Sequence, residues 1–246
     1  MKILIIRHGE PDYAVDSLTP KGWHEAELLA DRLCREPADA YYVSPLGRAR
    51  DTARATLKRL GREAEVLPWL EEFRGTFLEP KSGNRTHAWD LIPQYWTRCP
   101  ELFQPDGWTE NALLRTGNAA EIHKETALGL DALLARHGYV RDGMIYRTQK
   151  NRAETLVLFC HFGISMVMLS HLLGIPPMPL LHGFITAPTS VTTLVTEERL
   201  PGEVWFRCVE LGDTSHLYVA NEPVSQYGRF YEIYGRDEGL GANPSV

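Results

Sequence analysis

Two short segments dominated by apolar residues stand out along the chain, KILII at residues 2–6 and TLVLFC at residues 155–160. Short runs of this kind are typical of strands buried on both faces, and such strands belong to parallel sheets covered by helices. Weaker patterns predict further strands. They lie at residues 40–43 (AYYV), 64–67, 190–195 (SVTTLV) and 203–211 (EVWFRCVEL).

Apolar residues at helical spacing follow several of these strands. After Thr19-Pro20 the apolar face is formed by Trp23, Ala26, Ala30 and Leu33. A threonine N-cap followed by proline is a typical helix start, and Ser44-Pro45 repeats this signature before a second amphipathic segment. Residues 120–137 and 163–173 also have helical spacing. The alternation predicts an α/β fold, a three-layer sandwich whose mostly parallel central sheet is flanked by helices.

The regular pattern is interrupted between residues 76 and 122. Tryptophans, phenylalanines, prolines and glycines appear there without a clear period, which predicts an inserted lobe of short helices and a candidate lid. Residues 221–246 form a polar and aromatic tail, and its last residues, GLGANPSV, are expected to be loose. We expect one domain over residues 1–246 that carries this insertion and this tail.

Composition narrows the classes of partner. The net charge is −6, the pI is near 5.9, and the chain has no strongly basic segment, which argues against nucleic acid as a partner. The apolar start is too short for a signal peptide, and no apolar run approaches the roughly 18 residues of a membrane span, so we expect a cytoplasmic protein without membrane contact. The four cysteines are scattered, which argues against a zinc site and a disulfide scaffold: Cys34, Cys99, Cys160 and Cys208.

Histidines and arginines lie where the predicted strands end. Arg7 and His8 follow the first strand, and His161 follows TLVLFC in the same way. Arg48 lies one turn into the helix after the predicted strand at residues 40–43. Because the carboxyl ends of parallel strands meet at one edge of a sheet, we expect these four side chains to lie close together.

This set suits phosphoryl transfer. Guanidinium groups such as those of Arg7 and Arg48 bind the peripheral oxygens of a phosphate group. A neutral imidazole can attack phosphorus, which predicts His8 as the nucleophile, and Gly9 leaves room for the phosphate. We expect His161 to donate a hydrogen bond to the transferred oxygens.

The leaving alkoxide needs a proton from a general acid. Two adjacent carboxyls, Glu71 and Glu72, follow the predicted strand at residues 64–67 and lie next to Trp69 and Phe73. Apolar neighbours favour the protonated form of a carboxyl, so one of these two residues is predicted to be the acid.

Four segments resemble, in order, the histidine phosphatase superfamily of phosphoglycerate-mutase-like proteins. They are RHGE at residues 7–10, SPLGRARDTA at 44–53, the L-x-E segment at 70–72 and CHFG at 160–163, with a weaker match in GDTSHL at 212–217. The resemblance implies an α/β phosphate pocket of Arg7, His8, Arg48 and His161, with His8 phosphorylated during turnover. Its L-x-E register points to Glu72, whereas the spacing back from Gly75 points to Glu71. We predict Glu72 as the acid, with Glu71 as the alternative.

The chain departs from the family pattern after RHGE. The family often has threonine or serine there and an asparagine soon after, whereas here Pro11, Asp12 and Tyr13 follow, which puts one phosphate contact in doubt. The resemblance implies neither a metal nor an organic cofactor. Asp12, Tyr13 and Arg74 are candidate substrate contacts, and His216 in GDTSHL is the further histidine of interest.

Three functions fit these features. The first is a phosphatase that hydrolyses the phosphate monoester of a small metabolite. The second is a phosphoglycerate-type mutase, which needs more cations than the insertion offers: Lys81, Arg85, Arg98 and Arg115. The third is a non-catalytic phosphate-binding protein. Aromatic residues of the insertion form its small core or cover the pocket, and an exposed aromatic lobe could also support a homodimer.

Overall fold

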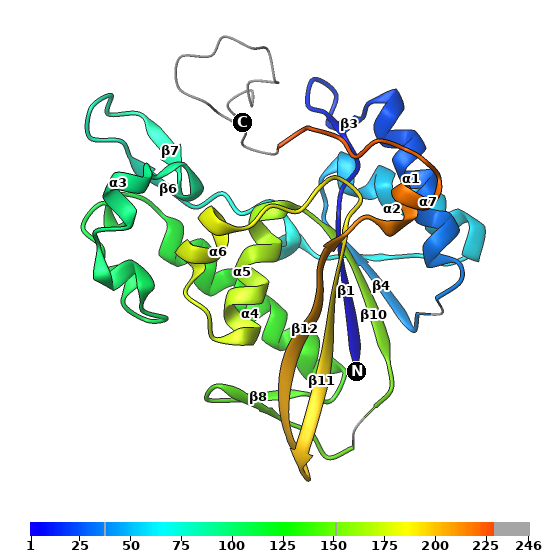
Figure 1. Ribbon diagram of the computed structural model, residues 1–246. Coiled ribbons are helices and arrows are strands. Elements are labelled where there is room, and N and C mark those ends of the chain that lie inside the picture. The colour runs from blue at the N-terminus through cyan, green and yellow to red at the C-terminus, as the bar shows by residue number, and fades with distance from the viewer. Residues whose placement is uncertain (37, 151, 229–246) are drawn as a thin grey trace.

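A mixed eight-stranded sheet forms the centre of the molecule (Figure 1). The computed structural model describes residues 1–36, 38–150 and 152–228. Strand order is β5-β4-β10-β1-β11-β12-β9-β8, and the first four strands in this order are parallel. These are β5 (Glu65–Val66), β4 (Ala40–Val43), β10 (Thr155–Cys160) and β1 (Lys2–Arg7). The antiparallel half comprises β11 (Val191–Leu200), β12 (Glu203–Asp213), β9 (Ile145–Arg147) and β8 (Val140–Asp142).

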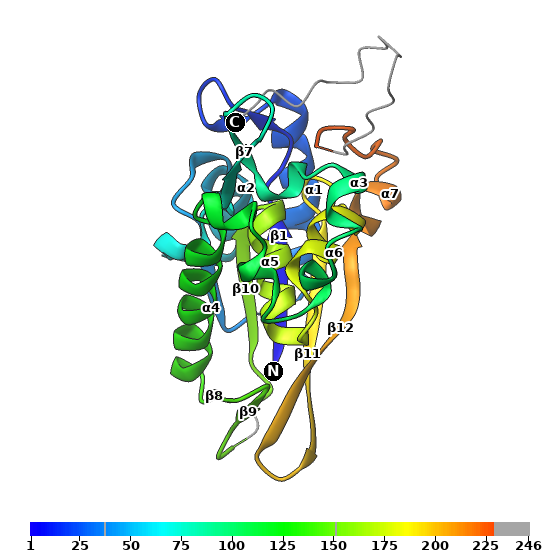
Figure 2. The same cartoon turned by 90° about the vertical axis from the view of Figure 1, so that its left-hand side faces the viewer.

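Helices cover both faces of the sheet, so the predicted three-layer α/β fold is confirmed (Figures 1 and 2). Successive residues of β1 point to opposite faces, and Leu4 belongs to one buried cluster while Ile5 belongs to the other. Helices α1 (Pro20–Leu33) and α2 (Gly47–Leu60) pack on the first face, and α4 (Ala119–Arg136) and α5 (Phe162–Leu173) pack on the second. Shorter elements that the sequence did not predict are β2 (Pro11–Asp12), β3 (Ser17–Leu18), α6 (Pro177–Gly183) and α7 (Ser215–Val219).

One of the two predicted helix caps is confirmed and the other is wrong. Thr19 caps α1, since its hydroxyl accepts a hydrogen bond from the backbone N–H of Gly22 at 3.0 Å. Helix α2 begins at Gly47 rather than at Pro45, and Ser44 is not its cap. The cap comes from a distant loop, because the carboxylate of Asp16 accepts the Gly47 N–H at 2.6 Å. The Ser44 hydroxyl is therefore available to the site described below.

The insertion contains the expected short helices and, in addition, a hairpin. Its elements are β6 (Thr76–Leu78), β7 (Arg85–His87), α3 (Pro93–Trp96) and 3-10 turns at Ala88–Asp90, Pro100–Phe103, Trp108–Glu110 and Leu114–Thr116; a further 3-10 turn, Pro68–Leu70, precedes it. Phe77, Leu102 and Trp108 are fully buried and join the same apolar cluster as α4 and α5. The core of the insertion is therefore continuous with one layer of the sandwich.

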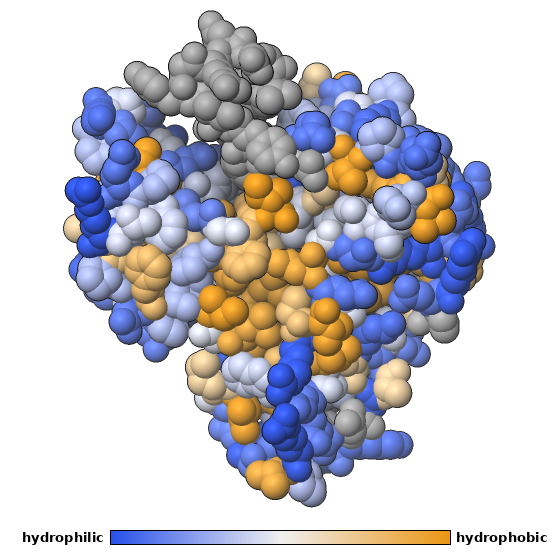
Figure 3. All heavy atoms as spheres, in the orientation of Figure 1, coloured by the Kyte–Doolittle hydropathy of each residue, from blue (hydrophilic) through white to orange (hydrophobic). Residues whose placement is uncertain are grey.

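Apolar side chains also gather on the surface between α6 and β12 (Figure 3). Exposed residues of these segments are Phe184, Ile185, Val209 and Leu211. The homodimer that such a surface could support stays a prediction.

None of the described helices is long and apolar enough to cross a bilayer.

Candidate active site

The two strand-end histidines lie side by side at the carboxyl edge of the parallel strands. Pairing of β1 with β10 sets Arg7 opposite Cys160, and the His8 N–H donates to the Cys160 carbonyl at 2.9 Å. This register brings the rings of His8 and His161 to 5.1 Å between centroids, tilted by 58°. Both histidines are buried. The expected convergence of the strand ends is therefore present in the fold.

The ring of His8 is held in one tautomer. Its Nδ1 lies 2.7 Å from the carbonyl oxygen of Gly9, which can only accept a hydrogen bond, so Nδ1 carries the proton. Burial, with the nearby charges of Arg7 and Arg48, lowers the pKa of His8 well below its usual value. The ring is neutral at neutral pH, and Nε2 keeps a free lone pair.

Arg48 is fixed from two sides. Its guanidinium donates to the carboxylate of Asp16 at 2.6 Å and lies 5.1 Å from the ring centre of Tyr13. Asp16 also holds the first residue of α2, so one carboxylate positions both the helix and the arginine. No pattern in the sequence points to Asp16, which lies 32 residues away along the chain.

Arg7 is buried and donates to the carbonyl oxygen of Thr186. Within the described residues, Nε of Arg7 and Nε of Arg48 are buried without a hydrogen-bond partner. Buried donors without partners are rare, and a bound anion is the natural acceptor for two adjacent guanidinium groups.

His161 is oriented by Ser44. Its Nε2 lies 2.8 Å from the Ser44 hydroxyl, which also accepts the N–H of Leu46 at 3.3 Å. Nδ1 of His161 is buried and has no partner in the part of the chain that the structure describes. Burial, with the charges of Arg48 and Arg7 among its neighbours, lowers the pKa of His161 well below its usual value. A hydrogen bond from Ser44 to Nε2 leaves the proton on Nδ1, where it can be donated to an anion.

The two glutamates lie in different surroundings. Oε1 of Glu72 accepts the backbone N–H groups of Phe73 at 2.7 Å and Ile164 at 3.0 Å. Burial raises the pKa of Glu72. The two hydrogen bonds and the charges of Arg7 and Arg48 lower this pKa, but their effect is smaller than that of burial. The side chain of Glu71 is 38% exposed and forms an ion pair with Arg74 at 3.1 Å. Glu72 therefore lies in the electrostatic field of the two pocket arginines, whereas Glu71 is paired with the exposed Arg74.

The described start of the tail reaches the same site. The Ser225 hydroxyl donates to Glu10 at 2.6 Å, and the rings of Tyr227 and Tyr13 lie 5.8 Å apart. A methyl group placed on Gly228 would lie 2.5 Å from Nη2 of Arg7. The sequence did not predict this contact. GLGANPSV lies outside the described residues.

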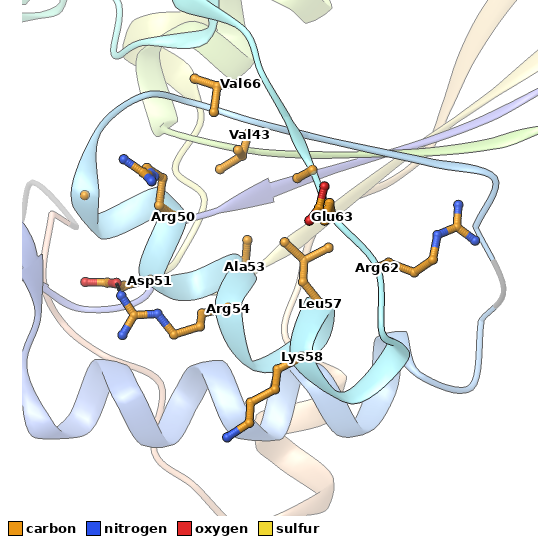
Figure 4. Close-up of a pocket in the computed structure, with 12 residues that line it drawn as sticks. Val43, Arg50, Asp51, Ala53, Arg54, Leu57, Lys58, Arg62, Glu63 and Val66 are labelled. Atoms are coloured by element: carbon orange, nitrogen blue, oxygen red, sulfur yellow. Dashed lines mark hydrogen bonds and ion pairs between the residues drawn. The ribbon is translucent and has the colours of Figure 1, made fainter.

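Other candidates lie elsewhere. His216 is buried against the hydroxyl of Thr189, 3.1 Å away, and burial lowers its pKa to about 4. Asp12 accepts the N–H of Ala14 within its own loop. A separate hollow runs along α2 (Figure 4), and its lining includes the exposed cations Arg50, Arg54, Lys58 and Arg62 but no member of the histidine pair.

Fold and site together define an α/β protein that gathers two neutral imidazoles and two buried guanidiniums at the carboxyl edge of a sheet. Residues 3–207 match the model of the histidine phosphatase superfamily (branch 1), and the chain belongs to this superfamily. One relative is an adenosylcobalamin/alpha-ribazole phosphatase of Salmonella typhi. It is 25% identical over 191 residues, which cover 74% of this chain and 84% of the relative.

Solved structures share the fold. A phosphoserine phosphatase mutant of Entamoeba histolytica in complex with phosphoserine has a TM-score of 0.60 at 20% identity. The match covers 88% of this chain and 98% of the chain of that structure. A mycobacterial glucosyl-3-phosphoglycerate phosphatase has a TM-score of 0.60 at 19% identity, and the match covers 87% of this chain and 99% of that one. The alpha-ribazole phosphatase of Shigella flexneri has a TM-score of 0.55 at 19% identity, and the match covers 87% of this chain and 96% of that one.

Proposed function

We propose that the protein is a phosphatase that hydrolyses a small phosphate monoester through a phosphohistidine at His8. The observation that carries this proposal is the state of the His8 ring, whose Nδ1 proton is bound by Gly9 while Nε2 stays unprotonated beside two buried arginines. Relatives and structural neighbours named as phosphatases support hydrolysis in general.

In the first step, Nε2 of His8 attacks phosphorus and forms an N–P bond as the ester P–O bond breaks. Arg7, Arg48 and the Nδ1 proton of His161 stabilise the charge on the peripheral oxygens. Glu72 gives its proton to the departing alkoxide, which leaves as the alcohol. The raised pKa of Glu72 favours the protonated carboxyl that this step needs.

In the second step, the Glu72 carboxylate takes a proton from water, and the resulting hydroxide attacks the phosphohistidine. The N–P bond breaks, the electron pair returns to Nε2, and inorganic phosphate leaves. Glu72 is protonated again, so the cycle closes without a metal or an organic cofactor.

Charges in the insertion support hydrolysis over a mutase. A mutase must hold a second acidic group, yet Arg115 forms an ion pair with Glu110, and Arg85 donates to the hydroxyl of Thr76. Interconversion of 3-phosphoglycerate and its isomer, measured in a coupled assay, would favour the mutase instead.

Replacement of the nucleophile tests the proposal. We expect His8→Ala to abolish turnover of p-nitrophenyl phosphate, because no other described ring nitrogen is held in this way beside both arginines. His24→Ala is the matched control, since His24 lies on α1 with an exposed side chain. Retained activity in His8→Ala would contradict the proposal. Phosphate binding without hydrolysis of any ester by the wild-type protein would identify a binding protein.

A further inference from the structure

A tryptophan of the insertion meets the predicted acid across a glycine at the start of α5. A methyl group placed on Gly163 would lie 2.6 Å from the ring of Trp89, 2.8 Å from Oε1 of Glu72 and 3.1 Å from Cβ of Phe73. Any side chain at this position would clash, so the edge of Trp89 and the carboxylate of Glu72 are neighbours over the backbone of α5.

This contact has a consequence for the substrate. A general acid must come within about 2.6–3.2 Å of the oxygen that it protonates. Oε1 of Glu72 accepts two backbone N–H groups, so the proton of the acid is carried by Oε2 of the same carboxyl. The carbon chain of the leaving alcohol starts at the oxygen that receives this proton, so the alcohol lies beside the neighbours of the Glu72 carboxyl. Trp89 is one of them.

Trp89 is held in place as a rigid ring. His87 stacks on it with 4.6 Å between ring centres and 7° between planes, and Phe73 packs against it at 6.4 Å and 49°. Yet Trp89 is only partly buried, whereas Trp108 of the same insertion is buried completely. A fixed aromatic ring that keeps exposed surface beside the acid is suited to contact with a ligand.

We propose that Trp89 forms the binding surface for the leaving group and that the protein prefers monoesters whose alcohol carries a planar ring. The proposal rests on the phosphatase function proposed above. Ring-on-ring contact adds to ordinary apolar burial, and an aromatic pair of this kind corresponds to roughly a threefold to tenfold change in KM. Trp89 thus determines specificity, while the phosphate pocket performs the chemistry.

A pair of esters tests the preference. Benzyl phosphate and cyclohexylmethyl phosphate share a primary alkoxide and nearly the same size, but only the first has an aromatic ring. We expect the wild-type protein to have the lower KM for benzyl phosphate. Trp89→Leu should raise that KM by about threefold to tenfold and remove the preference, with kcat and inhibition by inorganic phosphate unchanged.

The insertion offers a matched control. Trp96 also stacks on a histidine, His182, at 4.9 Å and 30°, but it packs against α6. Trp96→Leu should leave the ratio of the two KM values unchanged. Trp89→Phe keeps a ring and should retain part of the preference, and it serves as the test if Trp89→Leu does not fold.

The outcomes separate the two proposals. Equal KM values in the wild-type protein, or a preference that survives in Trp89→Leu, would overturn the role of Trp89 and leave the phosphatase function standing. Failure to hydrolyse benzyl phosphate while p-nitrophenyl phosphate is hydrolysed would overturn the role of Trp89 alone. Failure to hydrolyse any of these three esters would overturn both proposals.

Discussion

The phosphate pocket and the insertion are built in opposite ways. The pocket takes its side chains from the ends of β1 and β10 and the first turn of α2, and each side chain is held by a specific polar contact, such as Gly9 for His8 and Asp16 for Arg48. Side chains of the insertion lie on a short hairpin, helix α3 and 3-10 turns, and several of its large rings pack against other rings, as Trp108 does against His123.

This difference separates two tasks. Phosphoryl transfer needs charges at fixed positions, and regular strands with polar anchors supply them. Recognition of a leaving group needs a surface that can vary while the chemistry stays constant, and irregular segments on a rigid scaffold are suited to that. The comparison predicts that changes in the pocket alter catalysis, whereas changes in the insertion core alter stability.

The largest expected effect comes from the acid. Glu72→Gln keeps an oxygen that can accept from Phe73 and Ile164 but cannot give up a proton. We expect kcat/KM for an alkyl phosphate to fall by about 10²–10⁴-fold, and that for p-nitrophenyl phosphate to fall less, because nitrophenolate leaves without a proton. Glu71→Gln, the matched control, should change both rates by less than about twofold. The reverse pattern would make Glu71 the acid.

The same variant alters the pH profile. In the wild-type protein, kcat/KM should fall as pH rises through the raised pKa of Glu72, because the acid loses its proton. The rate should also fall at low pH, well below the usual range of histidine, where His8 becomes protonated. Glu72→Gln should lose the alkaline decline and keep the acid one. An unchanged alkaline decline in this variant would assign it to another group.

Next in size is the core of the insertion. Trp108 is buried, and we expect Trp108→Ala to lower the free energy of unfolding by about 3–5 kcal/mol in urea titration, because its removal leaves a large cavity. Trp108→Phe should cost less. Loss of stability below about 1 kcal/mol for the alanine variant would show that the insertion does not share the core of the sandwich.

A smaller effect is expected from Asp16. Asp16→Ala removes the acceptor of both Arg48 and Gly47, and we expect kcat/KM to fall about 10- to 100-fold with weaker inhibition by inorganic phosphate. Asp16→Asn keeps one acceptor and should lose less. Asp12→Ala is the control, because the Asp12 carboxylate accepts the N–H of Ala14 within its own loop. Equal losses in Asp12→Ala and Asp16→Ala would argue against a specific role of Asp16.

An effect limited to the pH dependence of stability concerns Glu25, which is buried under the loop after His8 and accepts the Glu10 N–H at 3.0 Å. Burial raises its pKa from 4.5 to about 7. Between about pH 4.5 and 7, the folded state therefore holds a proton that the unfolded state has released. The free energy of unfolding should decrease as the pH rises through this range, by at most about 3 kcal/mol. Glu25→Gln should flatten this slope. The exposed Glu27→Gln on the same helix should not, and a slope unchanged in Glu25→Gln would assign it to other groups.

Local patterns predicted the sheet and the convergence of its strand ends, because buried strands and strand-end residues leave a continuous signal in the sequence. The partners of those residues could not be predicted in this way. Asp16, which replaces Ser44 as the cap of α2, and Thr186, which binds Arg7, meet the site only after the chain has folded. The hairpin of β6 and β7 was missed because three-residue strands carry too little periodicity to detect.

The contact of Gly228 with Arg7 was missed for the same reason, since a polar tail has no pattern that points to its docking site. The choice between Glu71 and Glu72 also depends on tertiary surroundings. Adjacent residues have the same local sequence, and tertiary contacts distinguish them: Glu71 forms an ion pair with Arg74, whereas Glu72 accepts a hydrogen bond from Ile164.

Rapid alkaline quenching of the working enzyme tests the central claim most directly. With a labelled phosphate ester in excess, we expect one phosphoryl group per chain, attached to Nε2 of His8, stable in alkali, labile in acid and absent from His8→Ala. A label on another residue, or steady hydrolysis in which no phosphorylated protein forms and His8→Ala keeps its rate, would contradict the account.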